Sequence, residues 1–432
     1  MDTPFSTIPP GFVDSVPELR FIELVPPDSP SLKDSLLTTI AAMCEFMDTY
    51  KPLAKRTISQ LATELSSNSV SIAALVFDMF TTNFMGVAND LGLPSYLFYA
   101  SGAALLGLVL RLPVLDTEID SDFTDHKPGE LAIPSFKSLV PIVSFPSLLW
   151  RRDEEYKWLL YHARRMRDAK GIIVNSFYEL EPYAIDSFTS GDHPRVHSVG
   201  PIVDSTSRVG QITGSNGSKD KTHDDIVKWL DKQPPRLVVF LCFGSEGTFD
   251  VTQAKEIANG LERSGYPFLW SVRPRDGSTR LEALVPDGFM ERTAKRGMVV
   301  GGWVPQVAVL GHRSVGCFVS HCGWNSTLES VWFGVPILTW PMYAEQHLNT
   351  FLIVKELGLG VELKGYWRVG EDDLVTADEV ERGVRSVMEG ECHEEVKKRV
   401  EEMKEKSRRA IVEGGSSFVT IESLLEELIG KN

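Results

Sequence analysis

Short apolar runs rich in β-branched residues alternate with segments of helical periodicity along most of the chain. In the first half, strand-like runs occupy 20–25, 72–77, 94–100, 171–175 and 196–199. In the second half they occupy 237–243, 268–273, 298–304, 316–321, 336–340 and 360–363. Regular alternation of this kind is typical of parallel βαβ units. The sequence therefore predicts an α/β protein with two Rossmann-like domains.

A polar segment rich in Gly and Ser at 204–221 separates the two halves. Such a composition is typical of linkers, and 432 residues suit two domains of roughly 200 residues each. We expect a first domain at 1–203, a linker at 204–222 and a second domain at 223–412. The final helix, at 413–432, is expected to pack back toward the first domain.

The formal charge of −15 argues against nucleic acid or an anionic membrane as a partner, because either would require a basic face. The longest apolar run, at 100–115, is interrupted by Arg111 and Pro113 and is too short to span a bilayer. The first ten residues do not resemble a signal peptide, and the five cysteines are widely scattered. These features favour a cytoplasmic protein, which we expect to be monomeric.

A strand-like run at 316–321 leads through His-Cys-Gly-Trp-Asn-Ser into a helical segment. Small and hydrogen-bonding residues at a strand–turn–helix junction leave backbone N–H groups free to bind an anion. The stretch from 303 to 346 therefore predicts a site for a phosphate-containing ligand. Taken singly, Trp303 or His321 would more often be a core residue. A zinc site formed by His312, Cys317, His321 and Cys322 is disfavoured, since paired C-x-x-C spacing is lacking.

The same 44 residues resemble the signature box of plant secondary-metabolite UDP-glycosyltransferases. The window contains W-x-P-Q, H-C-G-W-N-S, a glutamate at 329, G-V-P and W-P-x-x-A-E-Q at the family's spacing. Similarity continues through 175–180, 233–235 and 243–245. So many identities in one window are far more specific than a lone glycine motif. The resemblance implies the GT-B fold, in which two Rossmann-like domains face a cleft.

The resemblance also implies a role for each residue of the donor site. Trp303 would stack on uracil, the Val304 backbone would pair with the base edge, and Gln306 and Glu329 would hold the ribose. The diphosphate would be contacted by Ser245, His321, Asn325 and Ser326. The sugar would be contacted by Trp324, Glu345 and Gln346. These residue types suit the chemistry, because a flat base favours an aromatic face and a diphosphate favours N–H donors.

By the same resemblance, Gln346 and Trp324 favour a neutral sugar, so UDP-glucose is the expected donor. The implied reaction is inverting transfer of glucose to a hydroxyl group, without a metal ion or other cofactor. The acceptor pocket would draw on the apolar stretches 80–85 and 98–106 and on the irregular segment 116–150. Such a pocket suits a small lipophilic acceptor such as a flavonoid, another phenolic or a terpenoid.

Asp78 ends the apolar run 72–77 and is expected at the carboxyl end of a buried strand. It could simply cap the following turn. In the family, however, the matching aspartate pairs with a catalytic histidine that deprotonates the acceptor, and imidazole is a suitable base near neutral pH.

The family carries that histidine in a glycine-containing loop after its first strand, and this sequence shows no such motif. We therefore expect an N-terminal domain without that strand and loop. Two interpretations remain open. One is an incomplete gene model or a shortened splice form of an active glucosyltransferase, and the other is a UDP-sugar-binding pseudoenzyme without turnover. A nicotinamide-dependent oxidoreductase is disfavoured, because neither half shows G-x-G-x-x-G after its first strand.

Overall fold

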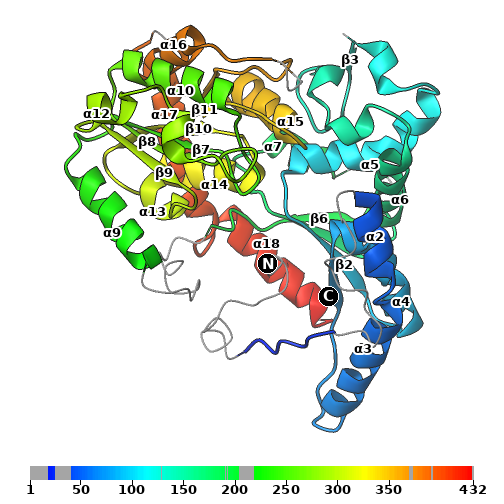
Figure 1. The fold of residues 1–432 in the computed structure, drawn as a ribbon. Coiled ribbons are helices and arrows are strands. Elements are labelled where there is room, and N and C mark those ends of the chain that lie inside the picture. The colour runs from blue at the N-terminus through cyan, green and yellow to red at the C-terminus, as the bar shows by residue number, and fades with distance from the viewer. Residues whose placement is uncertain are drawn as a thin grey trace. The chain divides into compact units, whose positions relative to one another are not determined.

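The fold is described from a computed structural model, which divides the chain into two compact units (Figure 1). The described residues are 18–24, 40–127, 129–189, 191, 193–203, 218–368, 373–390 and 393–430. The first unit comprises Met1–Ile142, Ser147–Pro201 and Ala410–Asn432. The second comprises Val143–Pro146 and Ile202–Arg409. The expected linker at 204–222 lies largely outside the described residues.

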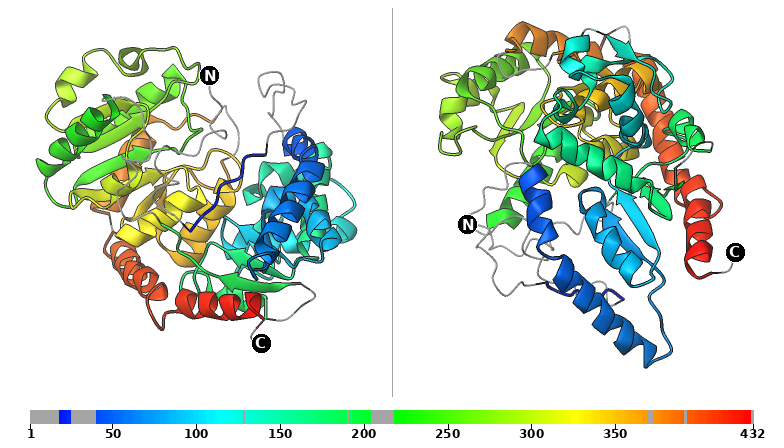
Figure 2. Two further views of the ribbon diagram at one scale, coloured as in Figure 1. Left: turned by 90° about the horizontal axis from the view of Figure 1, so that it is seen from below. Right: turned by 90° about the vertical axis from the view of Figure 1, so that its right-hand side faces the viewer.

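The first unit contains a parallel four-stranded sheet in the order β1-β2-β5-β6. The strands are β1 (Leu75–Asp78), β2 (Ser95–Tyr99), β5 (Gly171–Val174) and β6 (Arg195–Ser198). Helices connect them, as Figures 1 and 2 show. They are α2 (Ile40–Asp48), α3 (Lys51–Ser66), α4 (Met85–Asp90), α5 (Ala103–Glu118), α6 (Glu154–Met166) and α7 (Pro182–Ser187). Between α5 and α6 the described residues form only two-residue strands and short 3₁₀ turns, in agreement with the predicted irregular segment.

Two predictions for the first unit are wrong. β1 was expected to be buried, but among the described residues it pairs only with β2, and Val76 is 53% exposed. An apolar run alone therefore did not distinguish an edge strand from a central one. A strand was also expected at 20–25, yet 18–24 form neither helix nor strand, and Val25 lies outside the described residues.

The N-terminus of α5 is capped by a residue far away in the sequence. Ser101 is a plausible cap from the sequence, but the helix begins after Gly102, which has no side chain to offer. The carboxylate of Glu181 instead accepts hydrogen bonds from the N–H groups of Ala103 (2.9 Å) and Ala104 (2.8 Å). The Ser176 hydroxyl donates to the same carboxylate. Burial raises the pKa of Glu181, and these three bonds oppose that shift.

The last helix, α18 (Ser416–Leu428), packs against β6 within the first unit. The Ser417 hydroxyl donates to the carbonyl oxygen of Gly200, and the Tyr96 hydroxyl donates to Glu427 at 2.6 Å. The C-terminal segment is thus held to the sheet by hydrogen bonds near both ends of the helix.

The second unit contains a parallel six-stranded sheet in the order β12-β11-β10-β7-β8-β9. The strands are β7 (Val238–Cys242), β8 (Phe268–Val272), β9 (Gly297–Gly301), β10 (Val315–Ser320), β11 (Ile337–Thr339) and β12 (Gly360–Glu362). From β7, the strands that follow in sequence, β8 and β9, are added toward one edge of the sheet. From β10, the following strands β11 and β12 are added toward the opposite edge. Ligands of open α/β sheets bind at the carboxyl edge near such a reversal.

Alternate residues of the central strands point to opposite faces of this sheet, and each face has its own core. Val239 and Leu241 pack with α10 (Val251–Ser264) and α16 (Ala377–Met388). Phe240 packs on the other face, with α9 (Ser218–Asp231) and α13 (Gln306–Leu310). The remaining helices are α11 (Leu281–Leu284), α12 (Phe289–Thr293), α14 (Trp324–Phe333), α15 (Gln346–Phe351) and α17 (His393–Ala410). The predicted α/β class with two parallel-sheet units is confirmed.

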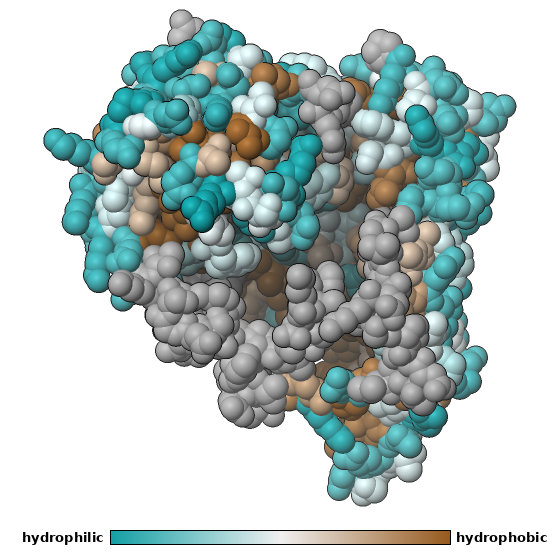
Figure 3. Space-filling view, in the orientation of Figure 1, coloured by the Kyte–Doolittle hydropathy of each residue, from teal (hydrophilic) through white to brown (hydrophobic). Residues whose placement is uncertain are grey.

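The face in Figure 3 is mostly hydrophilic over the described residues, with hydrophobic residues gathered in separate patches. Within the described part of the chain, no helix has the length and apolar character needed to cross a membrane.

Candidate functional site

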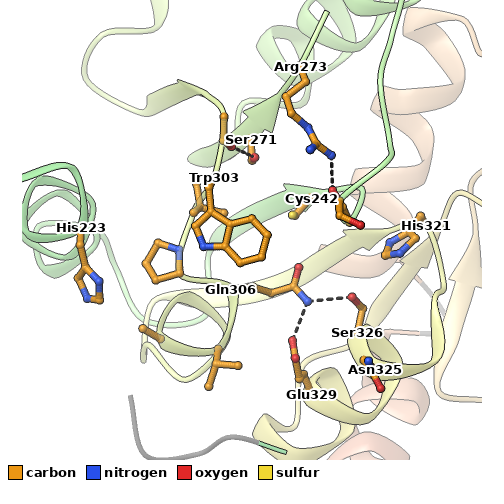
Figure 4. Close-up of a pocket in the computed structure, with 17 residues that line it drawn as sticks. His223, Cys242, Ser271, Arg273, Trp303, Gln306, His321, Asn325, Ser326 and Glu329 are labelled. Atoms are coloured by element: carbon orange, nitrogen blue, oxygen red, sulfur yellow. Dashed lines mark hydrogen bonds between the residues drawn. The ribbon is translucent and has the colours of Figure 1, made fainter. Parts of the chain in front are cut away.

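A cavity of about 440 Å³ opens at the carboxyl ends of β7, β8, β9 and β10 in the second unit (Figure 4). This is the edge where the strand order reverses. Eight of the predicted donor-site residues line it: Ser245, Trp303, Val304, Gln306, His321, Asn325, Ser326 and Glu329. Residues up to 84 positions apart in the sequence are thereby brought together by the parallel sheet.

Trp303 presents its indole ring to the cavity. Gly302 links it to the end of β9. Gly302 has a φ of 128°, a value that favours glycine. Its carbonyl oxygen accepts a hydrogen bond from the Ser271 hydroxyl at 2.6 Å. The next residue, Val304, is buried, whereas Trp303 is 68% exposed. A ring held by its backbone and left uncovered can stack on a planar ligand.

Gln306 and Glu329 form a hydrogen-bonded pair on the cavity wall (Figure 4). The side-chain amide of Gln306, the first residue of α13, donates to the Glu329 carboxylate at 2.6 Å and to the Ser326 hydroxyl at 2.8 Å. This arrangement orients the carboxylate on the middle of α14. A carboxylate so placed is a strong acceptor for hydroxyl groups of a ligand.

His321 follows β10 and is closely flanked by two glycines. A Cβ atom on Gly244 or Gly323 would lie within 2.6 Å of its Nε2 atom. The side chain is 7% exposed, and its Nδ1 atom is buried without a hydrogen-bond partner among the described residues. Burial lowers the pKa of His321 to about 4, so the imidazole is neutral near pH 7. A neutral imidazole can still donate one N–H to an anion.

The N-terminus of α14 is available to an anion. Its N-cap residue, Gly323, provides no side-chain cap. The preceding turn is tightly held: Cys322 has a φ of 65°, and its carbonyl oxygen accepts a hydrogen bond from the Asn349 side chain at 2.9 Å. Asn325 and Ser326 lie in the first turn and line the cavity. Free N–H groups and the helix dipole together favour phosphate at this position.

The three residues assigned to the sugar do not line this cavity. They lie near one another in the second unit. The Glu345 carboxylate accepts a hydrogen bond from the Trp324 backbone N–H. Burial raises the pKa of Glu345. The Gln346 side-chain oxygen accepts from the N–H groups of Met342 (2.9 Å) and Tyr343 (3.0 Å). Trp324 and Gln346 are each 3% exposed. Their contacts to a sugar stay predictions.

Nine of the seventeen residues that line the cavity were not assigned to the site from the sequence, and four of these have a polar or thiol side chain: His223, Cys242, Ser271 and Arg273. Arg273 follows β8 directly, and its guanidinium donates to the carbonyl oxygens of Gly244 and, at 3.4 Å, Gly247. It thereby fixes the turn that presents Ser245. A basic residue immediately after a strand was the available signal, because strand ends meet at this edge.

Asp78 lies in the first unit, at the end of β1. Its carboxylate accepts a hydrogen bond from the N–H of Phe80 at 2.9 Å and caps the 3₁₀ turn Met79–Phe84. This is the capping arrangement that the sequence allowed. In the described part of the chain, no histidine is hydrogen-bonded to Asp78, and no group of three acidic, His or Cys side chains is placed to hold a metal ion.

Comparison with known proteins agrees with the geometry of the cavity. Residues 202–404 match the family model described as UDP-glucoronosyl and UDP-glucosyl transferase. UDP-glycosyltransferase 71B2 of Arabidopsis thaliana is 43% identical over 96% of this chain and 87% of its own length. UDP-glucose flavonoid 3-O-glucosyltransferase 6 of Fragaria ananassa is 45% identical over 89% of this chain and 81% of its own length.

Among solved structures, Medicago truncatula UGT71G1 complexed with UDP-glucose matches with a TM-score of 0.87 and 39% identity. The match covers 99% of this chain and 89% of that one. A UGT transferase from Siraitia grosvenorii in complex with UDP has a TM-score of 0.82 and 40% identity, over 89% of this chain and 88% of that one. These similarities extend through both units, well beyond the signature box. The chain therefore belongs to the UDP-glycosyltransferase family.

Proposed function

We propose that this protein transfers glucose from UDP-glucose to a hydroxyl group of a small lipophilic acceptor, with inversion at the anomeric carbon. One observation carries the proposal. A single cavity combines an exposed indole, an oriented carboxylate and a helix N-terminus that Gly323 leaves without a side-chain cap, beside a buried imidazole nitrogen that has no partner among the described residues. These groups suit a base, a ribose and a diphosphate respectively.

In this arrangement Trp303 stacks on uracil, the Val304 backbone pairs with its edge, and Glu329, oriented by Gln306, accepts the ribose hydroxyls. Ser245, His321, Asn325, Ser326 and the N–H groups of α14 hold the diphosphate. The leaving UDP carries the growing negative charge, so donors fixed before reaction stabilise the transition state.

We further propose that these donors replace a divalent cation. The neutral His321 imidazole supplies an N–H, and the α14 terminus supplies partial positive charge. Glucosyl transfer should therefore continue at full rate in excess EDTA. A rate restored only by added Mg²⁺ would show that the protein groups are insufficient.

The reaction itself forms one bond and breaks one. The acceptor hydroxyl oxygen bonds to C1 of glucose, the bond from C1 to the phosphate oxygen breaks, and the hydroxyl proton passes to a base. Asp78 is the proposed catalytic carboxylate, which would stabilise a protonated base. Glu345, Gln346 and Trp324 are proposed to contact the sugar hydroxyls, with glucose as the preferred sugar.

For the acceptor we propose a flavonoid, another phenolic or a terpenoid. The Fragaria relative is named as a flavonoid 3-O-glucosyltransferase, and a Manihot esculenta relative, 44% identical, as an anthocyanidin 3-O-glucosyltransferase. We also propose that the protein acts as a monomer in the cytoplasm, which the net charge and the four free cysteines described in the structure support. Cell fractionation and light scattering would test these two points.

The transferase proposal is tested by measuring UDP release with a flavonol acceptor and UDP-glucose, UDP-galactose or UDP-glucuronate as donor. We expect release to be fastest with UDP-glucose. Isothermal titration with UDP-glucose in the absence of acceptor runs in parallel. Binding without UDP release for any acceptor would instead favour a UDP-sugar-binding protein without turnover.

A further inference from the structure

A second hollow, of about 650 Å³, lies in the same unit as the donor cavity but shares no lining residue with it. We call it the Lys364 pocket, and its key residues are Glu246, Phe249, Asp250, Trp340, Tyr343 and Lys364. It opens beside the ends of β11 and β12 and the start of α10. The donor cavity lies toward α13 and α14, whereas the Lys364 pocket lies toward α10 and α16. Both therefore use the ligand-binding edge of the sheet, on opposite helical layers.

Lys364 is the unusual group in this pocket. It follows β12, and its backbone N–H donates to the carbonyl oxygen of Thr339 at 2.9 Å, which fixes where the side chain starts. The residue is only 8% exposed, yet its ammonium makes no hydrogen bond or ion pair with any described residue. The ammonium faces the pocket beside the charge of the Asp373 carboxylate, and an acceptor group on a ligand there can take up its N–H donors.

The acidic residues of the pocket are committed to other partners. Both carboxylate oxygens of Asp373 are held by Arg368, at 2.6 and 2.7 Å. The Asp250 carboxylate caps α10 by accepting from the N–H of Gln253 at 2.8 Å. Glu246 is exposed, where solvent and salt screen its charge. Arg275 adds a second positive charge to the wall. A small anion can therefore meet Lys364 without displacing an existing ion pair.

Aromatic rings form another part of the wall. Trp340 and Phe249 pack edge to face, with ring centroids 5.7 Å apart, and both line the pocket. Tyr343 is 37% exposed beside them. Trp340 and Phe249 are buried, so Tyr343 is the ring of this wall that a ligand can contact. An exposed ring next to a cation suits a ligand with a flat ring and an attached anionic group.

We propose that the Lys364 pocket binds a small aromatic carboxylate, with the carboxylate on the Lys364 ammonium and the ring against Tyr343. The carboxylate supplies the acceptors that Lys364 lacks, and charge-assisted bonds of this type are the strong ones. The ligand binds independently of the nucleotide, because the two cavities share no residue. This site goes beyond the transfer reaction and does not depend on it.

The test uses benzoate as probe and benzyl alcohol as its neutral counterpart, measured by ligand-observed NMR on the full chain. Saturating UDP is present throughout, so that the donor cavity cannot host the probe. We expect saturable benzoate binding to the unaltered protein and much weaker binding of benzyl alcohol. Lys364→Met removes the charge at similar size and should weaken benzoate about tenfold or more. Lys364→Arg keeps the charge and should retain most of the affinity.

UDP affinity measured on every variant reports whether the second unit is folded and whether the donor site survives. Should Lys364→Met fail to fold, Thr252→Trp provides an independent variant, because the exposed Thr252 lines the pocket and a large ring there would block entry. Equal affinity of benzoate for Lys364→Met, unchanged binding to Thr252→Trp, or no saturable benzoate binding to the UDP-saturated protein would each overturn the proposal.

Discussion

The side-chain amide of Gln306 donates to the carboxylate of Glu329 at 2.6 Å, which ties the start of α13 to the middle of α14. The same amide donates to the Ser326 hydroxyl at 2.8 Å. The Glu329 carboxylate is therefore oriented before any ligand arrives. Preorganisation of this kind reduces the entropy cost of ligand binding.

Replacing Glu329 with Ala should weaken UDP binding roughly tenfold, because a charge-assisted hydrogen bond to the ribose is lost. The sharper expectation concerns 2′-deoxy-UDP. The unaltered protein should bind it more weakly than UDP, whereas the variant should bind both alike. Glu291→Ala, an exposed acidic residue on α12, is the matched control and should change neither affinity. A variant that still discriminates the two nucleotides would place the ribose elsewhere.

Trp303→Ala should weaken UDP binding by roughly tenfold or more, since base stacking on an aromatic ring contributes about 1–3 kcal/mol. The indole is 68% exposed, so the free energy of unfolding should hardly change. Urea unfolding and isothermal titration measure the two quantities. The control is Trp367→Ala, which removes a 49% exposed indole that does not line the cavity. Equal losses of affinity in both variants would argue against stacking at Trp303.

Glu181→Gln should lower the free energy of unfolding of the protein by about 2 kcal/mol. Its carboxylate caps α5 by accepting from the Ala103 N–H at one oxygen and from the Ala104 N–H at the other, so an amide N–H₂ would face one of the two donors in either orientation. Glu118→Gln, at the other end of the same helix, breaks a solvent-exposed ion pair with Arg111 and should cost under about 0.5 kcal/mol. Chemical unfolding measures the free energy of unfolding of both variants. A similar loss in Glu181→Gln and Glu118→Gln would contradict a stabilising role of the buried cap.

The unfolding free energy should fall as pH drops from 6.5 toward 4, and His162 should contribute to the fall. Burial is the main cause that lowers its pKa to about 4. Its Nδ1 atom lies 2.7 Å from the Thr82 hydroxyl and its Nε2 atom 3.1 Å from the Cys44 sulfur. Below pH 6.5 the unfolded chain binds a proton that the folded chain does not, so unfolding is favoured. The loss reaches roughly 3 kcal/mol at most.

His162→Gln removes this titrating group and keeps hydrogen-bonding capacity at the site. The difference in unfolding free energy between pH 7 and pH 5 should therefore be smaller in the variant. The unaltered protein, measured in parallel, is the reference for the pH dependence. An unaltered pH dependence in His162→Gln would mean that this imidazole is not held neutral in the folded protein.

The fold class and most elements of the second unit followed from the sequence, because strand and helix periodicities were clear there. Eight residues of the cavity in the second unit could also be predicted, since seven of them stand in one motif-rich window and Ser245 follows a strand end. The cap of α5 by Glu181 could not be predicted, because Glu181 lies 78 residues from Ala103 and no local sequence pattern links the two. Nor could the exposure of β1, because an apolar run does not reveal which neighbours a strand has. Arg273 could have been proposed from its place directly after a strand, but the turn that it holds through the carbonyl oxygens of Gly244 and Gly247 appears only in the structure.

The most direct test of the proposed glucosyl transfer is the product. The protein is incubated with UDP-glucose carrying ¹³C at the anomeric carbon and with a flavonol, and the mixture is examined by NMR and mass spectrometry. We expect a flavonol that has gained one labelled glucose, with the β configuration that inversion of the α-linked donor requires, together with an equal amount of UDP. A labelled product of α configuration would contradict inversion. UDP-glucose that binds but remains intact with every acceptor would contradict the transferase assignment itself.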